Sequence, residues 1–266
     1  MPARPLAELV DIHLQRGETR VFEGLSLRLD FGESTAILGP NGSGKTSLLK
    51  LFASEIHPLV REGSYVRLMG MERWNVWELR HHLGLLSQDL QGDYDAHVRG
   101  LEIVLSGLYS SIGTYAHQSF SNADIDDARR LMRELGIEQL GAKLYGHMST
   151  GQQRRFLLAR ALIHHPETLI LDEPTTGLDL EATIHYLQLM RGLIQGGKTL
   201  ILVTHHLHEI PPEIGRVVLL KQGRIMADGP KHEVLTSSAL NSLYDVPLRL
   251  LEADGWYQAV PGDVQP

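Results

Sequence analysis

The segment Gly39–Thr46, with the sequence GPNGSGKT, has the spacing of a phosphate-binding loop. It matches G-x-x-x-x-G-K-[ST] at every fixed position, follows the strand-like run STAILG and leads into the helical pattern SLLKLFA. Glycines let a backbone bend until successive N–H groups converge on phosphate oxygens, and the start of the following helix adds its dipole. A glycine-rich turn without chemistry is the alternative interpretation, and the flanking strand and helix argue against it.

Two side chains of this loop would act on a nucleoside triphosphate. Lys45 is predicted to bridge the β- and γ-phosphates, and Thr46 is predicted to place its hydroxyl on Mg²⁺. The residues of this segment and the one after it that we expect to contact the nucleotide are Gly39, Pro40, Asn41, Gly42, Ser43, Gly44, Lys45, Thr46 and Ser47.

Two carboxylates follow another apolar strand-like run, in TLILDE. Ligands of open α/β sheets bind at this end of the strands. Asp172 is expected to hold Mg²⁺, through water because Mg²⁺ keeps much of its hydration shell. Glu173 is expected to act as the general base that polarises the attacking water. Either carboxylate alone could be a solvated strand cap, but the phosphate-binding loop elsewhere in the chain favours the catalytic interpretation.

A third polar segment, Ser149–Gln152, opens the apolar-periodic run of HMSTGQQRRFLLARAL. A short, glycine-containing helix start of this kind is typical of a site for an anion. The segment contains no lysine of the phosphate-gripping type. The residues alone therefore leave open which anion it meets, and which chain binds that anion.

The elements that must position these residues alternate between strands and helices. Strand-like runs lie near the N-terminus, around the phosphate-binding loop, in TLILDE and in TLILVTHH, and helical patterns separate the later ones. This alternation predicts an α/β fold with a parallel-sheet core. The segment from about 90 to 150 is helical throughout and is interpreted as an insertion. The tail RLLEADGWYQAV predicts a small hairpin around Asp254-Gly255.

Composition excludes several classes of protein. The 266 residues carry a net charge of −7, whereas nucleic-acid binders usually present a concentrated basic face, so no nucleic acid is expected. The sequence has no cysteine, which excludes disulfides and thiol chemistry. No apolar run reaches the roughly 18 residues that a membrane helix needs. Any membrane role is therefore expected to come through a partner.

With these motifs in order, the chain resembles the nucleotide-binding subunits of ABC (ATP-binding cassette) transporters over roughly residues 6–236. Gln88 matches the family's Q-loop glutamine, which contacts Mg²⁺ and links the ATP site to the helical subdomain. MSTGQ matches the signature usually written LSGGQ, with Thr150 replacing the first glycine. Asp179 matches the D-loop, and His205 matches the switch histidine that contacts the γ-phosphate. Alone, each of these would more often be structural; their shared order favours function.

The resemblance implies an ABC ATPase domain over residues 1–236 and a short C-terminal extension over 237–266. The domain would combine a RecA-like P-loop NTPase core with an N-terminal antiparallel β subdomain and an α-helical subdomain inserted at about 90–150. The resemblance also implies ATP and Mg²⁺ as ligands. It names Glu173, His205 and Lys45 as catalytic, and Thr46, Gln88 and Asp172 as the groups around the metal.

The resemblance also assigns the signature segment. In this family two cassettes stack head to tail around two ATP molecules, and the signature of one copy meets the γ-phosphate held by the other. Ser149, Gly151 and Gln152 would serve that role, so no lysine is needed there. Arg16 stands where the family often stacks an aromatic residue on adenine. A guanidinium can stack on a purine, and a solvated loop arginine is the equally open alternative.

The implied function is an ATP-hydrolysing subunit that energises transport through a separate membrane permease by ATP-driven dimerisation. It would lie in the cytoplasm, at the inner face of the cell membrane. Parts of the chain resemble cassettes for metal-chelate, siderophore or oxyanion uptake. The alternative is a soluble, non-transport cassette that acts on the ribosome or on DNA. Such proteins usually carry two cassettes in one chain or long coiled-coil insertions, and this sequence has neither.

Overall fold

The computed structural model describes residues 4–262, apart from the side chains of residues 76 and 77. Within this range the chain forms two compact units. Residues up to 76, together with those from 199 onward, make the first unit, and residues 77–198 make the second. The domain boundaries expected from the sequence stay a prediction.

The first unit contains the expected N-terminal antiparallel sheet. Its strands β1 (Pro5–Arg16), β2 (Thr19–Asp30) and β4 (Tyr65–Leu68) lie in the order β2-β1-β4. Burial alternates along β2, where Leu25, Leu27 and Leu29 are buried on one face as the sequence pattern predicts.

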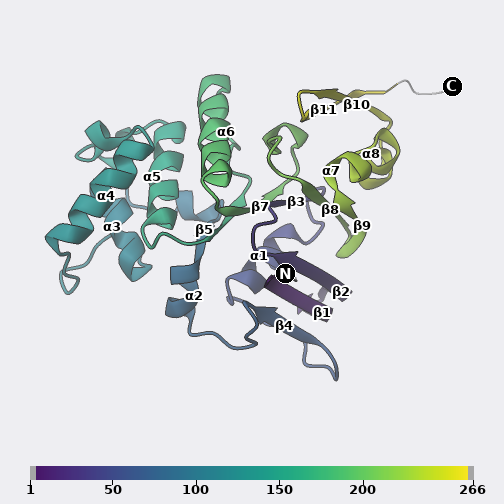
Figure 1. Cartoon of the computed structure of the whole chain (residues 1–266). Helices are drawn as coiled ribbons and strands as arrows, with labels where there is room; N and C mark the ends of the chain where they lie inside the picture. The colour runs from purple at the N-terminus through teal and green to yellow at the C-terminus, as the bar shows by residue number, and fades with distance from the viewer. Residues whose placement is uncertain (1–3, 263–266) are drawn as a thin grey trace. The chain divides into compact units, whose positions relative to one another are not determined.

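The first unit also contains strands of the nucleotide-binding core. They are β3 (Thr35–Leu38), β7 (Thr199–Thr204), β8 (Arg216–Lys221) and β9 (Arg224–Pro230), in the order β7-β3-β8-β9. β3 runs parallel to β7 and β8, and β9 is antiparallel to β8 (Figure 1). β3 and β7 are buried along their whole length, as the apolar runs of parallel strands predict.

The C-terminal part of the first unit is helical and then hairpin-like. The short helix α7 (Lys231–Val234) is followed by α8 (Ser237–Tyr244) and by the hairpin of β10 (Leu248–Ala253) and β11 (Trp256–Pro261). Asp254 and Gly255 make the turn with positive φ angles of 53° and 79°. The predicted hairpin is therefore present.

The second unit holds the remaining parallel strands and most of the helices. β5 (Leu83–Leu86), preceded by α2 (Val76–His82), pairs in parallel with β6 (Thr168–Asp172). Helices α3 (Gly100–Ser106), α4 (Asn122–Glu134) and α5 (Thr150–Leu162) pack against one another (Figure 1). Helix α6 (Leu180–Gln195) contacts α5.

The helical part of the second unit is held by tight packing. Phe156 of α5 is fully buried, and a Cβ placed on Gly100 at the start of α3 would lie 2.5 Å from its ring. The glycine thus lets α3 approach α5 closely. The expected α/β fold, with a parallel-sheet core and additional antiparallel strands, is confirmed. No helix within residues 4–262 is both long enough and apolar enough to cross a membrane.

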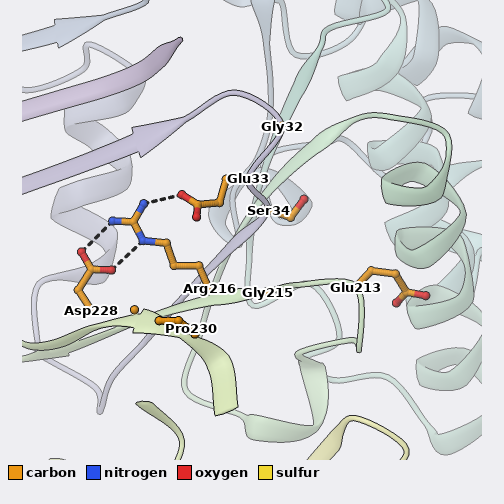
Figure 2. Close-up of a pocket in the computed structure, with 9 residues that line it drawn as sticks. Gly32, Glu33, Ser34, Glu213, Gly215, Arg216, Asp228 and Pro230 are labelled. Carbon is orange, nitrogen blue, oxygen red and sulfur yellow. Dashed lines mark hydrogen bonds and ion pairs between the residues drawn. The ribbon is translucent and has the colours of Figure 1, made fainter. Parts of the chain in front are cut away.

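An ion-pair cluster in the first unit joins β8, β9 and the connection between β2 and β3. Arg216, at the start of β8, donates two hydrogen bonds to Asp228 at 2.7 and 2.8 Å and one to Glu33 at 2.7 Å. Figure 2 shows the guanidinium between the two carboxylates, in a pocket of about 520 Å³. The Arg216 side chain is only 16% exposed, and its hydrogen bonds to Asp228, with that to Glu33 adding to them, raise its pKa.

Replacing Arg216 should weaken folding of the full chain. Arg216→Met keeps much of the aliphatic stem but leaves Asp228 and Glu33 without their shared partner. We expect a loss of about 1–3 kcal/mol in the free energy of unfolding, measured by urea denaturation. The matched control is Arg224→Met, because that side chain is 72% exposed and lies 3.6 Å from Glu23. The control should lose under about 0.5 kcal/mol in the free energy of unfolding. Equal losses in the two variants would contradict a stabilising role for the Arg216 ion pairs.

Candidate active site

The predicted phosphate-binding loop connects β3 to helix α1 (Lys45–Phe52). Gly42 and Gly44 have φ angles of 78° and 108°, which side chains other than glycine rarely adopt. A Cβ on Gly44 would lie 2.7 Å from the Phe22 ring, and one on Gly39 would lie 2.2 Å from the carbonyl oxygen of Leu220. The glycines are therefore required by both conformation and space.

Lys45 folds back over this loop. Its ammonium donates to the carbonyl oxygens of Gly39 at 2.7 Å and Pro40 at 3.0 Å, and the residue is 6% exposed. The Ser43 hydroxyl is buried and has no hydrogen-bond partner among the described residues. Within the described residues no side chain caps the start of α1, a helix end of the kind that binds anions. A buried cation, an unpaired hydroxyl and an uncapped helix start fit a polyphosphate.

Strand ends on either side hold the loop in place. The Gly39 N–H donates to the carbonyl of Thr204 at 3.3 Å, and the Gly223 N–H donates to the carbonyl of Ser43 at 2.9 Å. In the parallel ladder, Leu38 pairs with Thr204. The phosphate-binding loop and His205 therefore leave adjacent strands at the same sheet edge, as their predicted roles require.

The segment 204–209, called the switch loop here, has a hydrogen-bonded interior. The Thr204 hydroxyl accepts from the His206 N–H at 2.8 Å and donates to the carboxylate of Glu209, which is fully buried. The His205 and His206 rings lie 3.7 Å apart between centroids. Sequence reasoning missed Glu209, because nothing in its spacing shows that it bends back to the end of β7.

The two predicted catalytic carboxylates stand at the end of β6. Asp172 is buried and ends the strand, while Glu173 has a φ of 45°. Such a left-handed conformation costs a non-glycine residue on the order of 1–3 kcal/mol, so its surroundings must impose it. Leu86 pairs with Leu171 in the parallel ladder, so Gln88 and Glu173 each lie two residues beyond that pair. The structure thus brings the Q-loop glutamine to the carboxylate strand.

Asp179 and the signature segment both begin helices. The Asp179 carboxylate caps α6 by accepting from the Ala182 N–H at 2.8 Å. Ser149 caps α5, because its hydroxyl accepts from the Gln152 N–H at 3.3 Å. The Ser149 N–H in turn donates to the Gln152 side-chain oxygen at 3.2 Å. A Cβ on Gly151 would lie 2.9 Å from the Ala182 side chain, which places the signature beside the start of α6.

Thr150 adopts an ordinary helical conformation as the first residue of α5. It is absent from the residues with positive φ, so the threonine fits where the family usually has glycine.

A hydrogen-bonded ring that the sequence did not reveal links the Q-loop to the signature helix. The Gln91 side chain donates to the Gln153 side chain at 2.8 Å, and Gln153 donates to the Tyr145 carbonyl at 3.0 Å. The Tyr145 hydroxyl closes the ring by donating to the Gln91 carbonyl at 3.0 Å. Burial raises the pKa of Tyr145, so the hydroxyl keeps its donor proton.

The predicted site residues divide between the two units. The phosphate-binding loop and His205 belong to the first unit, and the carboxylates, Gln88, Asp179 and the signature belong to the second. Arg16 is exposed at the β1–β2 turn, and its stacking on adenine stays a prediction. The groups expected around Mg²⁺ offer hydroxyl, amide and carboxylate oxygens, which are the ligands that Mg²⁺ prefers.

The comparisons with known proteins decide the family. The model of a family described as ABC transporter matches residues 22–176, more than half of the chain. This chain belongs to the ABC transporter family.

Individual relatives of this ABC cassette are ATP-binding proteins of the same family. It is 33% identical to YlmA of Bacillus subtilis (strain 168), an uncharacterized ABC transporter ATP-binding protein, over 96% of both chains. It is also 33% identical to the hemin import ATP-binding protein HmuV of Photobacterium damsela subsp. piscicida, over 91% of this chain and 89% of the relative. Among solved structures, an ABC transporter described as of metal-chelate type, in an inward-facing conformation, matches with a TM-score of 0.77. The two chains are 21% identical, and the match covers 96% of each.

Family membership establishes the activity. The cassette binds ATP with Mg²⁺ and hydrolyses it, as the ATP-binding subunit of an ABC transporter. Cassettes of this family dimerise and work with membrane permeases. The comparisons give no support to a non-transport role on the ribosome or DNA.

Proposed function

We propose that two copies of this cassette close head to tail around two ATP molecules and so drive a separate membrane permease. The observation that carries the proposal is the start of α5. Ser149 is exposed there, and its hydroxyl accepts the Gln152 N–H, which leaves its own proton free to donate. An exposed helix start with a spare donor fits a phosphate that another chain holds. The segment Ser149–Gln152 has no lysine of its own, and the Lys143 ammonium, which donates to the Gln152 side-chain oxygen at 2.9 Å, adds positive charge beside it.

The residues would act as follows. Lys45 would exchange the carbonyls of Gly39 and Pro40 for β- and γ-phosphate oxygens. Glu173 would take a proton from the attacking water, and His205 would contact the γ-phosphate. Thr46, Asp172 and Gln88 would hold Mg²⁺, which would supply positive charge to neutralise the phosphates. Asp179 would keep its capping bond to α6 while it faces the other copy. These roles follow from the family's motifs, and the geometry of each unit supports them.

Closure would then report the nucleotide state to the permease. ATP would join the two copies, and hydrolysis would weaken that contact, so the dimer would switch between closed and open states. The ring of Gln91, Gln153 and Tyr145 supports this, because it ties the segment after Gln88 to the signature helix. The cassette would accordingly work at the inner face of the cell membrane, without nucleic acid as a partner.

For the cargo, we infer the metal-chelate class, with hemin as the first compound to try. The support is the similarity to the hemin import protein and the sequence resemblance of residues 89–115 and 219–237 to cassettes for metal-chelate, siderophore or oxyanion uptake.

The test is transport in reconstituted vesicles. The full chain is co-purified with the membrane permease that it binds and placed in liposomes that contain Mg-ATP at the cassette side. We expect hemin accumulation that depends on ATP and is lost with Mg-ADP. Hemin transport at the same rate with Mg-ATP and Mg-ADP would contradict the coupling of ATP hydrolysis to transport. ATP-dependent transport of a siderophore or oxyanion in place of hemin would contradict only the choice of cargo.

A further inference from the structure

The C-terminal extension contacts the switch loop through one specific hydrogen bond. The hydroxyl of Tyr244, the last residue of α8, donates to the backbone carbonyl of His205 at 3.0 Å. Burial raises the pKa of Tyr244, so this hydroxyl keeps its proton at every pH at which the chain would work. The Tyr244 hydroxyl therefore stays a hydrogen-bond donor from the extension to His205, the residue expected to contact the γ-phosphate.

Helix α8 is fixed so that Tyr244 stays in place. Thr236 caps its start, and Leu240 and Leu243 are buried. At its other end, Lys221 from the last position of β8 donates to the Ser242 carbonyl at 2.5 Å and pairs with Asp245 at 2.6 Å. The tyrosine is thus anchored to a strand of the nucleotide-binding core.

The switch loop has room to move on the side that faces the extension. A cavity of about 310 Å³ lies there, and its lining includes His205, His206, His208, Tyr244 and Gln258. Strand β11 contacts the 3-10 turn Leu207–Glu209 beside it. Because this side is not fully packed, shape alone does not hold the His205 backbone. The Thr204–Glu209 bond ties the two ends of the loop to each other, and the Tyr244 bond holds the backbone at His205.

We propose that Tyr244 is a positioning residue for His205, and that the C-terminal extension sets the activity of the ATP site through this bond. The proposal rests on the proposed role of His205. A partner or ligand that displaced α8 would release the switch loop and lower hydrolysis. The extension is therefore assigned a positioning function in the ATPase reaction.

Tyr244→Phe isolates the bond, because it removes the hydroxyl and keeps the ring. We expect kcat for ATP hydrolysis to fall about three- to tenfold, the range that one hydrogen bond accounts for. The KM for ATP should stay within about twofold, because the phosphate-binding loop is untouched. Tyr257→Phe is the matched control: it removes a hydroxyl from the same extension, where the ring lies 5.6 Å from the Lys231 ammonium. It should leave kcat unchanged.

A double-mutant cycle separates positioning from general stability. If Tyr244 acts through His205, then Tyr244→Phe should cause no further loss in a His205→Ala background. Independent, multiplying losses would overturn the proposal. A wild-type kcat in Tyr244→Phe would also overturn the proposal. In that case, loss of activity in His205→Ala would still support the role of His205. If His205→Ala itself kept full activity, the proposed function of that residue would fail first.

Hydrogen exchange gives a readout that needs no turnover. Tyr244→Phe in the full chain should raise amide exchange within residues 204–209 and leave the strands β3 and β8 as protected as in the wild type. Unchanged exchange of the switch loop would overturn the proposal even if kcat fell. Faster exchange throughout the first unit would also overturn it, since the tyrosine would then act on general stability.

Discussion

The Glu173→Gln cassette is expected to bind Mg-ATP with near wild-type affinity and to hydrolyse it at least about 100-fold more slowly, because general-base catalysis contributes on this scale. Glutamine has nearly the same size as glutamate, so the shape at the end of β6 is kept. It cannot accept the proton of the attacking water. With chemistry blocked, the ATP-bound dimer should accumulate.

Two measurements check this result together. Phosphate release gives the turnover rate, and gel filtration with Mg-ATP gives the fraction of dimer. Glu181→Gln is the matched control, because Glu181 is an exposed carboxylate in the first turn of α6 in the same unit. It should hydrolyse at the wild-type rate and show no stable dimer. Hydrolysis by Glu173→Gln at the wild-type rate would remove Glu173 from the catalytic role.

The backbone at Glu173 makes this test informative. Its φ of 45° is imposed by the surroundings, and glutamine meets the same cost there as glutamate. A loss of activity therefore reports the missing carboxylate and not a relaxed turn. Glycine or alanine at this position would change the backbone energetics as well, and would mix two effects.

Local signals in the sequence predicted much of the fold and pointed to most of the candidate site residues. The phosphate-binding loop could be predicted because its glycines, its lysine and its flanking strand and helix are contiguous. The same holds for the Asp254-Gly255 turn, and for the leucine alternation along β2. Each depends on backbone conformation or burial within a few residues, which spacing alone encodes.

Contacts between distant residues could not be predicted in this way. The Tyr244–His205 bond joins residues 39 apart, and the Gln91–Gln153 bond joins residues 62 apart. A single sequence shows neither which segments meet nor which of many glutamines and tyrosines point inward. The resemblance supplied the roles of Gln88 and His205, but it carried no information about the groups that hold them.

The proposed role of the signature segment in the other copy's ATP site leads to a second large expected effect. Lys45→Ala removes the charge that grips the phosphates, and Ser149→Arg replaces a helix cap and spare donor with a bulky cation. Each homodimer then carries the same defect at both of its ATP sites. We expect each variant alone to lose nearly all hydrolysis, because charge stabilisation at the phosphates of the transition state is lost. Ser149→Arg should still bind ATP as a monomer, whereas Lys45→Ala should bind it much more weakly.

Mixing the two variants should restore activity. A heterodimer has one site that combines the intact Lys45 of one chain with the intact Ser149 of the other, and one site with both defects. Random pairing makes half of the dimers heterodimers with one good site in two, so recovery should approach about one quarter of wild-type hydrolysis if the sites work independently. Coupling between the sites would lower this value. Chains with two different affinity tags show how much heterodimer is present.

The mixing experiment also distinguishes an ATP site shared between two chains from an ATP site built within one chain. Suppose instead that Ser149 served the ATP bound by Lys45 of its own chain. Each chain in the mixture would then carry a defect in its own site, and pairing with the other variant would repair neither site. The mixture would then stay inactive even where tagged heterodimers are abundant. A cysteine pair at Ser149 and Asn41, in a chain that has no native cysteine, gives the direct check. With Mg-ATP the crosslink should join two chains into one covalent dimer; a crosslink that forms only within one chain would refute the head-to-tail arrangement.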